Sequence, residues 1–137
     1  MKKTKRRLSL LAVAVFASAL ANPVVAGYLS ADELKSIITN KTWTGHHAFK
    51  DRRGSRYFDE SGKSSGTTGT GTWRVSDEGM LCVSDDGNSN ERCRFVKKDG
   101  EKYKRYLVPK NRMAGHKHVW TTTRIEDGNT QNFKLAE

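Results

Sequence analysis

The chain has 137 residues, of which 25 are Lys or Arg, 15 are Asp or Glu, and 35% are hydrophobic. This length suits one compact domain and leaves no room for two hydrophobic cores. Residues 8–20, the longest apolar run, are too few to cross a bilayer as a helix. With the twelve glycines added, the apolar share is about 44%, close to the globular average, which argues against a wholly disordered chain.

The N-terminal residues have the pattern of a secretory signal peptide. Five basic side chains lie within residues 1–7, an apolar segment fills residues 8–20, and Pro23 precedes a run of small residues that ends at Ala26. This order predicts export with cleavage after Ala26, to a periplasm or to the exterior. Ala21 is followed directly by Asn22 and not by a Cys, so we expect no lipid anchor, and we expect no transmembrane anchor in the cleaved chain. We therefore predict a signal peptide over residues 1–26 and a single β-rich domain over residues 27–137.

Removal of the five basic residues changes the charge balance. The remaining chain holds 20 basic and 15 acidic side chains, a net charge of +5. Residues 92–112 hold nine basic and two acidic side chains, which is +7 in 21 residues. A cluster of this sign is expected to bind an anionic partner, such as an envelope component or an acidic protein. The other interpretation is a solvated surface whose lysines discourage aggregation at strand edges. The candidate anion-binding residues are Arg92, Arg94, Lys97, Lys102, Lys104 and Arg105.

The two cysteines, Cys82 and Cys93, both lie in the exported part of the chain. An even pair in an oxidising compartment predicts a disulfide. Such a bridge would close a loop of about twelve residues and stabilise the fold by about 3 kcal/mol on the chain-entropy estimate. Catalytic redox pairs are usually separated by two residues at a helix start, so a redox role is not expected.

One helix is predicted near the start of the domain. Ser30 and Glu33 have the spacing of a capping box, in which each side chain bonds the backbone N–H of the other residue. Leu34, Ile37 and Ile38 then follow at helical spacing. We expect a short helix over residues 31–39.

The rest of the chain alternates turn residues with segments rich in Thr, Val, Tyr, Trp and Phe, which is typical of strands. Asp-Gly pairs at three of the connections suit tight hairpins. Consecutive hairpins predict an up-and-down antiparallel meander, closed or partly open as a small calycin-like barrel with the helix at one end. A two-sheet sandwich is the alternative. The eight expected strands are residues 42–49, 56–60, 68–75, 80–84, 92–97, 102–108, 118–125 and 130–135.

Alternation along a strand assigns side chains to faces. We expect the faces that carry the tryptophans to point inward. The three inward sets are then Trp43, Gly45, His47 and Phe49; Gly71, Trp73 and Val75; and His118, Trp120 and Thr122. On the strand 102–108, an inward set of Tyr103, Arg105 and Leu107 would make Arg105 a buried cation that needs a partner or a bound anion.

Several segments resemble a known family. They are residues 29–34 (LSADEL), 41–45 (KTWTG), 71–75 (GTWRV), 81–82 (LC), Cys93 and 98–103 (KDGEKY). These segments resemble a family of small exported bacterial proteins, domain of unknown function 995, over most of the domain up to about Tyr106. The Gly-x-Trp of residues 71–73 also resembles lipocalin-like barrels. The resemblance implies an exported β-rich domain and supports the paired cysteines, but it implies no activity.

The four histidines offer a possible metal site. His116 and His118 are two residues apart, so on a strand they would share a face, and His47 could add a third ligand for Zn or Cu. Neither histidine group has a carboxylate nearby. Histidines at a junction between a loop and a strand are also commonly just solvated.

No catalytic motif is present, whether a nucleophile elbow, a His-Glu-x-x-His or a phosphate-binding loop. Export and the lack of a basic, aromatic groove argue against nucleic acid as the partner. We therefore expect a monomeric, non-enzymatic binding module without a cofactor, which recognises an envelope component, an anionic ligand or a protein partner, in the last case as an inhibitor of a secreted enzyme. The alternative is a barrel that binds a small molecule or Zn or Cu through His47, His116 and His118.

Overall fold

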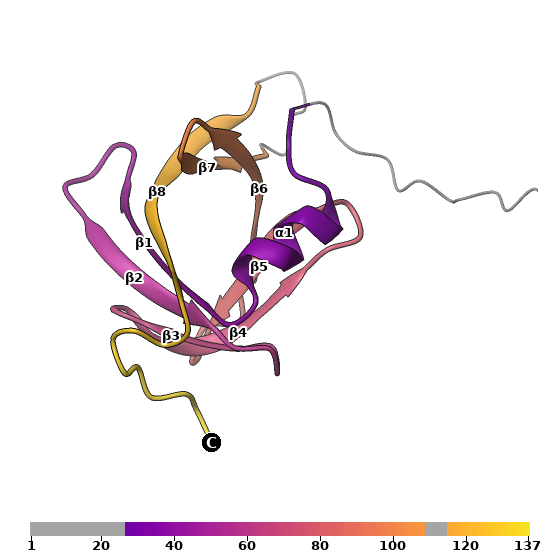
Figure 1. Ribbon diagram of the computed structural model, residues 1–137. Coiled ribbons are helices and arrows are strands. Elements are labelled where there is room, and N and C mark those ends of the chain that lie inside the picture. The colour runs from indigo at the N-terminus through magenta and orange to yellow at the C-terminus, as the bar shows by residue number, and fades with distance from the viewer. Residues whose placement is uncertain (1–26, 109–114) are drawn as a thin grey trace, which may run out of the picture.

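The computed structural model describes residues 27–108 and 115–137. Their strands form one closed antiparallel barrel in chain order, and β8 pairs with β1 to complete the ring (Figure 1). The predicted meander barrel is therefore confirmed, and the sandwich alternative is wrong. The signal peptide predicted at residues 1–26 lies outside the described part of the chain. The elements are α1 Ala31–Ile38, β1 Lys41–His47, β2 Arg53–Phe58, β3 Lys63–Gly66, β4 Gly69–Val75, β5 Met80–Asp85, β6 Arg92–Asp99, β7 Lys102–Leu107 and β8 Lys117–Asp127.

Helix α1 begins with the predicted capping box. Glu33 N donates to Ser30 Oγ at 3.3 Å, and Ser30 N donates to Glu33 Oε2 at 2.8 Å. These hydrogen bonds satisfy two backbone donors that the first helical turn would otherwise leave free. The backbone N–H of Ser30, and after it the Ser30 side chain, lower the pKa of the Glu33 carboxyl, because hydrogen bonds to the carboxylate favour its charged form.

Replacing Ser30 with Ala is expected to lower the free energy of unfolding by about 1 kcal/mol, the usual cost of losing an N-cap. The capping contribution of Glu33 is present above its unfolded-state pKa and is lost as pH falls through its lowered folded-state pKa. The difference between Ser30→Ala and wild type should therefore shrink in acid. Urea denaturation at neutral and acidic pH measures both effects. An equal loss from Ser36→Ala, which removes a hydroxyl that bonds only within the helix, would contradict this role for the cap.

Helix α1 closes one end of the barrel. Leu34 and Ile38 are fully buried in the core with Trp43, Phe58 and Val96. Trp43 Nε1 donates to the carbonyl oxygen of Ile37 at 3.1 Å, which ties the helix to the first strand. The helix packs against β1 and β4, and Figure 1 shows it lying against the barrel. Core side chains therefore fill the end of the barrel next to α1, and any cavity inside the barrel must lie toward the other end.

One strand, β3, was not predicted from the sequence. Its residues, Lys-Ser-Ser-Gly, include no β-branched or aromatic side chain, so they lack the usual strand composition. Ser64 and Ser65 are nevertheless buried, and Ser64 Oγ accepts a hydrogen bond from Arg56 Nη1 at 2.9 Å. The strand forms because its backbone pairs with both β2 and β4, and Arg56 satisfies the buried Ser64 hydroxyl.

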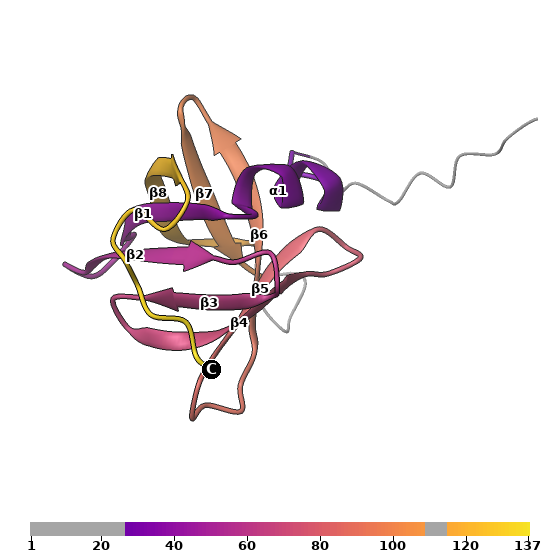
Figure 2. The same ribbon diagram turned by 60° about the horizontal axis from the view of Figure 1, so that its bottom comes forward.

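The strand predicted at residues 130–135 is wrong. The long strand β8 occupies the free edge of β1 and closes the ring, so no edge remains for a further strand to pair with. The tail instead turns at Asn132, which has φ 53°. It crosses the outer side of β1, β2 and β3 (Figure 2). There Gln131 Nε2 donates a hydrogen bond to Ser55 Oγ on β2, and the Ala136 carbonyl oxygen accepts one from Lys63 Nζ on β3. Within the described residues, no helix is long and apolar enough to cross a membrane.

Candidate binding site in the barrel

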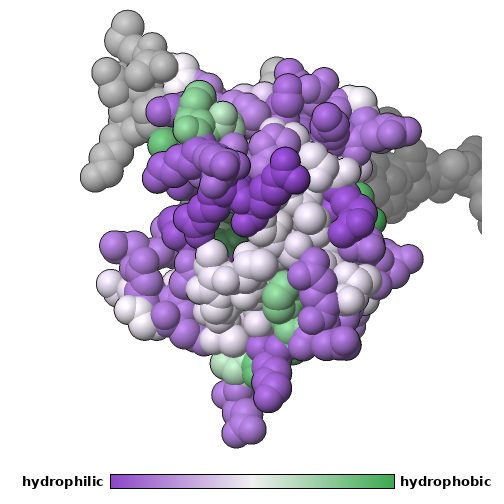
Figure 3. Space-filling view, turned by 90° about the vertical axis from the view of Figure 1, so that its left-hand side faces the viewer, coloured by the Kyte–Doolittle hydropathy of each residue, from purple (hydrophilic) through white to green (hydrophobic). Residues whose placement is uncertain are grey.

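The barrel contains a cavity of about 290 Å³ at the end opposite α1. The β1–β2 and β3–β4 hairpins and the strands β5 to β8 contribute the residues that line it. Seen from the side of the β1–β2 hairpin, the surface is hollowed, with hydrophobic atoms inside and hydrophilic residues around them (Figure 3). The volume lies near the lower limit for small-molecule pockets. The lining residues are Trp43, His47, Arg52, Arg53, Gly54, Ser55, Arg56, Thr67, Thr68, Leu81, Val83, Arg92, Arg94, Arg105, Val119 and Trp120.

The strand register places several arginines in this interior. Trp43 is opposite Arg56, Leu81 is opposite Arg94, and Val83 is opposite Arg92. Directly paired residues of neighbouring strands point to the same face, so the core residues carry the arginines inward with them. Among the described residues, the wall contains six arginines, of which Arg52, Arg53 and Arg92 are exposed, and no acidic residue lines it.

Two of these arginines share one carboxylate. Asp85 Oδ1 accepts from Arg56 Nη2 at 2.6 Å, and Asp85 Oδ2 pairs with Arg92 Nη2. Arg56 also donates to the hydroxyls of Ser64 and Thr68, so both of its Nη atoms are hydrogen-bonded within the protein. Asp85 thus offsets one of the two charges, and this group of three is largely satisfied by the protein itself.

Arg105 is a buried cation with no acidic partner among the described residues. Its guanidinium carbon lies 5.3 Å from the Trp43 ring centroid and 5.9 Å from that of Trp120. Its Nε is buried, and no hydrogen-bond partner for it is present in the described part of the chain. Burial first, and then the charges of Arg56 and Arg94, lower the pKa of Arg105 to about 9. Alternation left open which face of this strand points inward, and the structure places Arg105 on the inward face as a buried cation.

Arg94 is the second incompletely compensated cation. It lies directly opposite Leu81, and its Nη1 donates to the backbone carbonyl of Cys93 at 2.8 Å. No carboxylate within the described ranges pairs with it. Burial and the charge of Arg92 lower the pKa of Arg94. Because Arg94 and Arg105 also act on one another electrostatically, the two together form the least neutralised part of the wall.

An aromatic wall faces these cations. Trp120 lies across from Arg105 in the β7–β8 register and close to Gly45 on β1. A Cβ on residue 45 would be 2.7 Å from Trp120 Nε1 and 2.1 Å from the carbonyl oxygen of Thr121. Gly45 therefore allows the indole to lie against the first strand. Aromatic faces hold guanidinium groups favourably, so the wall can orient Arg105 without neutralising it.

The predicted inward faces are confirmed in part. Trp43 is buried, Trp73 packs against the core, and Trp120 lines the cavity. Phe49 is not inward: β1 ends at His47, and Phe49 is 62% exposed, with Lys117 over its ring. His118 does not share a face with Trp120 either, because the register shifts between them, and His118 instead lies against Tyr106.

The structure does not bring the candidate metal ligands together. His116 Nδ1 bonds to the Tyr28 hydroxyl at 2.6 Å, whereas His118 Nε2 lies 3.0 Å from the Thr121 hydroxyl. His47 Nδ1 accepts from the backbone N–H of Phe49. Among the described residues, the side chains close enough to share one ion are Cys82, Glu91 and Cys93, and their two sulfurs are bonded to each other.

The basic candidates divide into two groups. Arg92, Arg94 and Arg105 line the cavity, as above. Lys97 and Lys104 are paired across β6 and β7 outside it, and Lys104 forms an ion pair with Asp99. Lys102 is exposed at the start of β7. Four charged residues that line the cavity or pair with its wall were not predicted from the sequence, because they lie outside the basic cluster and closure of the barrel brings them there: Arg52, Arg53, Arg56 and Asp85.

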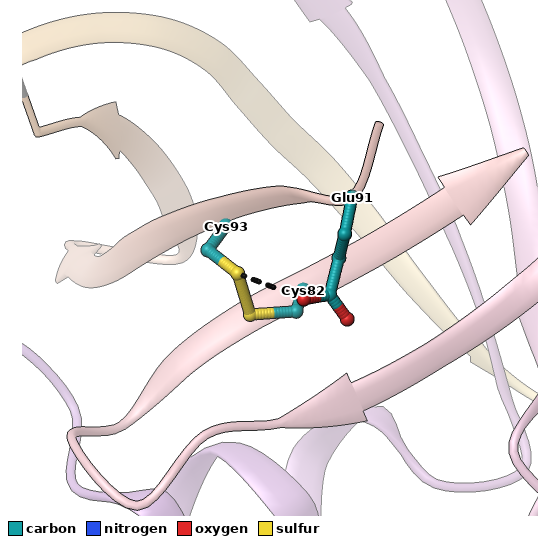
Figure 4. A group of neighbouring side chains, drawn as sticks. All are labelled: Cys82, Glu91 and Cys93. Atoms are coloured by element: carbon teal, nitrogen blue, oxygen red, sulfur yellow. Dashed lines mark hydrogen bonds between the residues drawn. A yellow bond between two sulfur atoms is a disulfide. The ribbon is translucent and has the colours of Figure 1, made fainter. Parts of the chain in front are cut away.

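The disulfide is confirmed. Cys82 and Cys93 are opposite each other on β5 and β6, with their Cα atoms 4.0 Å apart, and Glu91 lies beside the bridge (Figure 4). Their side chains point away from the cavity, while the neighbouring residues Arg92 and Arg94 point into it. The bridge therefore fixes the register that positions these two arginines.

The chain matches the family described as a protein of unknown function (DUF995) over residues 7–106. It belongs to this family. The match ends where the sequence resemblance ended, and it includes the strands that carry Arg56, Arg92, Arg94 and Arg105. No curated protein matches this DUF995 chain, and no solved structure does so either. The feature of the chain that bears on its function is therefore the cavity.

Proposed function

We propose that this protein is a non-enzymatic binding module that holds a small organic anion inside its barrel. The observation that carries the proposal is Arg105, a buried cation in a cavity of about 290 Å³ with no carboxylate to neutralise it among the described residues. Removing a charge from water is costly unless it is paired, and an anionic ligand would supply the pair.

The shape of the cavity indicates the remainder of the ligand. Trp43, Trp120, Leu81 and Val83 give it an apolar side, and the arginines give it a charged side. Guanidinium groups bind carboxylate and phosphate oxygens through paired hydrogen bonds. The ligand that fits best has an anionic group and a compact apolar or aromatic body.

Export is part of the proposal. The Cys82–Cys93 bridge suits an oxidising compartment, and the sequence of residues 1–26 predicts secretion. The ligand would then be a component of the envelope or of the surrounding medium.

Calorimetric titration of the purified protein with benzoate, phenyl phosphate and the neutral benzyl alcohol tests the proposal. We expect saturable one-to-one binding of at least one anion and no saturable binding of the alcohol, because the alcohol cannot compensate the arginines. Affinity should also fall as salt increases, although less steeply than for an exposed site, since the cavity walls limit screening. Equal binding of the alcohol, or no binding of either anion, would refute an anion-binding cavity.

A further inference from the structure

We infer that the cavity selects a small dianionic oxyanion, of the phosphate monoester class, over a singly charged one, and that Arg94 and Arg105 form its subsite. This inference rests on the proposed function and specifies the ligand of the same site. The juxtaposition that carries it is two inward arginines, which pair with no carboxylate in the described part of the chain, beside a separate group, Arg56, Asp85 and Arg92, that contains one.

The charges in the cavity set the ligand's preferred charge. Asp85 is engaged by Arg56 and Arg92, so it is not free to neutralise the other pair. Arg94 and Arg105 then present two positive charges. A monoanion would leave one of them uncompensated in a partly desolvated site, whereas a dianion would neutralise both.

The donors available in this subsite also favour a group with more than two oxygens. Each guanidinium can donate two parallel hydrogen bonds to one oxyanion. The Arg105 Nε adds a buried donor that the described residues leave unused. A carboxylate offers two oxygens for these donors, and a phosphate monoester offers three terminal ones. Several converging arginines suit the tetrahedral group better.

Phenyl phosphate and phenyl sulfate provide a matched pair of probes. They have the same ring and a tetrahedral head, but at pH 7.5 the phosphate is a dianion and the sulfate a monoanion. We expect phenyl phosphate to bind at least ~10-fold more tightly at pH 7.5, as one additional unit charge near two cations would produce. At pH 5, one unit below its second pKa of about 6, about nine-tenths of the phosphate is a monoanion, and the ratio of affinities should fall to about 2.

The ratio isolates the charge of the ligand. Among the described residues, the titratable and charged groups that line the cavity or pair with its wall are the six arginines, His47 and Asp85. At pH 5 both probes are mainly monoanions, so any titration of these groups acts almost equally on the two and cancels from the ratio. Arg94→Met should reduce the ratio at pH 7.5 toward 1, and Arg74→Met, on the outer surface, should leave it unchanged.

The outcomes separate this inference from the proposed function. If benzoate or phenyl sulfate binds as tightly as phenyl phosphate at pH 7.5, dianion selection is refuted and the anion-binding barrel stands. If none of the three anions binds, both are refuted. The wild-type comparison at two pH values needs no variant, so it remains decisive even if Arg94→Met fails to fold.

Discussion

Replacing Arg105 with Met is expected to abolish anion binding and to stabilise the protein. Affinity for the preferred anion should fall by at least ~100-fold, because a buried charge-assisted contact is lost. The free energy of unfolding should rise by about 1–2 kcal/mol, since removal of an unpaired buried charge outweighs the lost cation–π contacts with Trp43 and Trp120. Titration calorimetry and urea denaturation measure the two effects.

Lys102→Met is the matched control for Arg105→Met. It removes one positive charge from the same strand, but from an exposed position outside the cavity. It should leave binding within about twofold and stability within about 0.5 kcal/mol of wild type. If Arg105→Met destabilises the protein and keeps normal binding, then Arg105 is a structural residue and the cavity does not use it for a ligand.

Replacing Asp85 with Asn should have the opposite pair of effects. The amide cannot neutralise Arg56 and Arg92, and the protein should lose about 2–3 kcal/mol of stability. This is less than the loss for a fully buried pair, because the Arg92 side chain is 51% exposed and solvent screens it. Anion affinity should rise by about 10-fold, since the cavity gains one net positive charge. Added anion should then restore part of the lost stability.

The control for Asp85→Asn is Glu91→Gln. Glu91 pairs with Arg74 on the outer surface through two hydrogen bonds, so it tests the loss of a similar pair away from the cavity. We expect a cost of at most about 1 kcal/mol and unchanged affinity. Weaker anion binding in Asp85→Asn than in wild type would mean that Asp85 organises the site and does not compete with the ligand.

Much of the fold is predictable from local patterns. Ser30 and Glu33 mark the helix start, Asp99-Gly100 marks a hairpin with φ 60° at the glycine, and Cys82 and Cys93 are joined as expected. The strand β3 was missed because a buried serine strand has no compositional signal. The strand expected at residues 130–135 is absent because closure by β8 leaves it no partner, which is a property of the whole ring.

The site was less predictable. Alternation on β7 placed Arg105 on one face with Tyr103 and Leu107, since a two-residue period is a local property, but it did not decide which face is inward. The aromatic rings around Arg105 are those of Trp43 on β1, Phe58 on β2 and Trp120 on β8. The sequence does not show which strands will face one another across the barrel interior. The shift in register near His118 also separated it from Trp120, which alternation alone could not foresee.

The most direct test of the anion-binding cavity is an NMR titration of the arginine Nε–Hε signals with phenyl phosphate. We expect the Arg105 signal, assigned by its absence in Arg105→Met, to shift with the same dissociation constant that calorimetry gives. The Arg74 signal, from the outer surface, should not move. If Arg74 or the outer lysines respond to the ligand while Arg105 does not, the anion binds on the outside and the barrel interior is not the site.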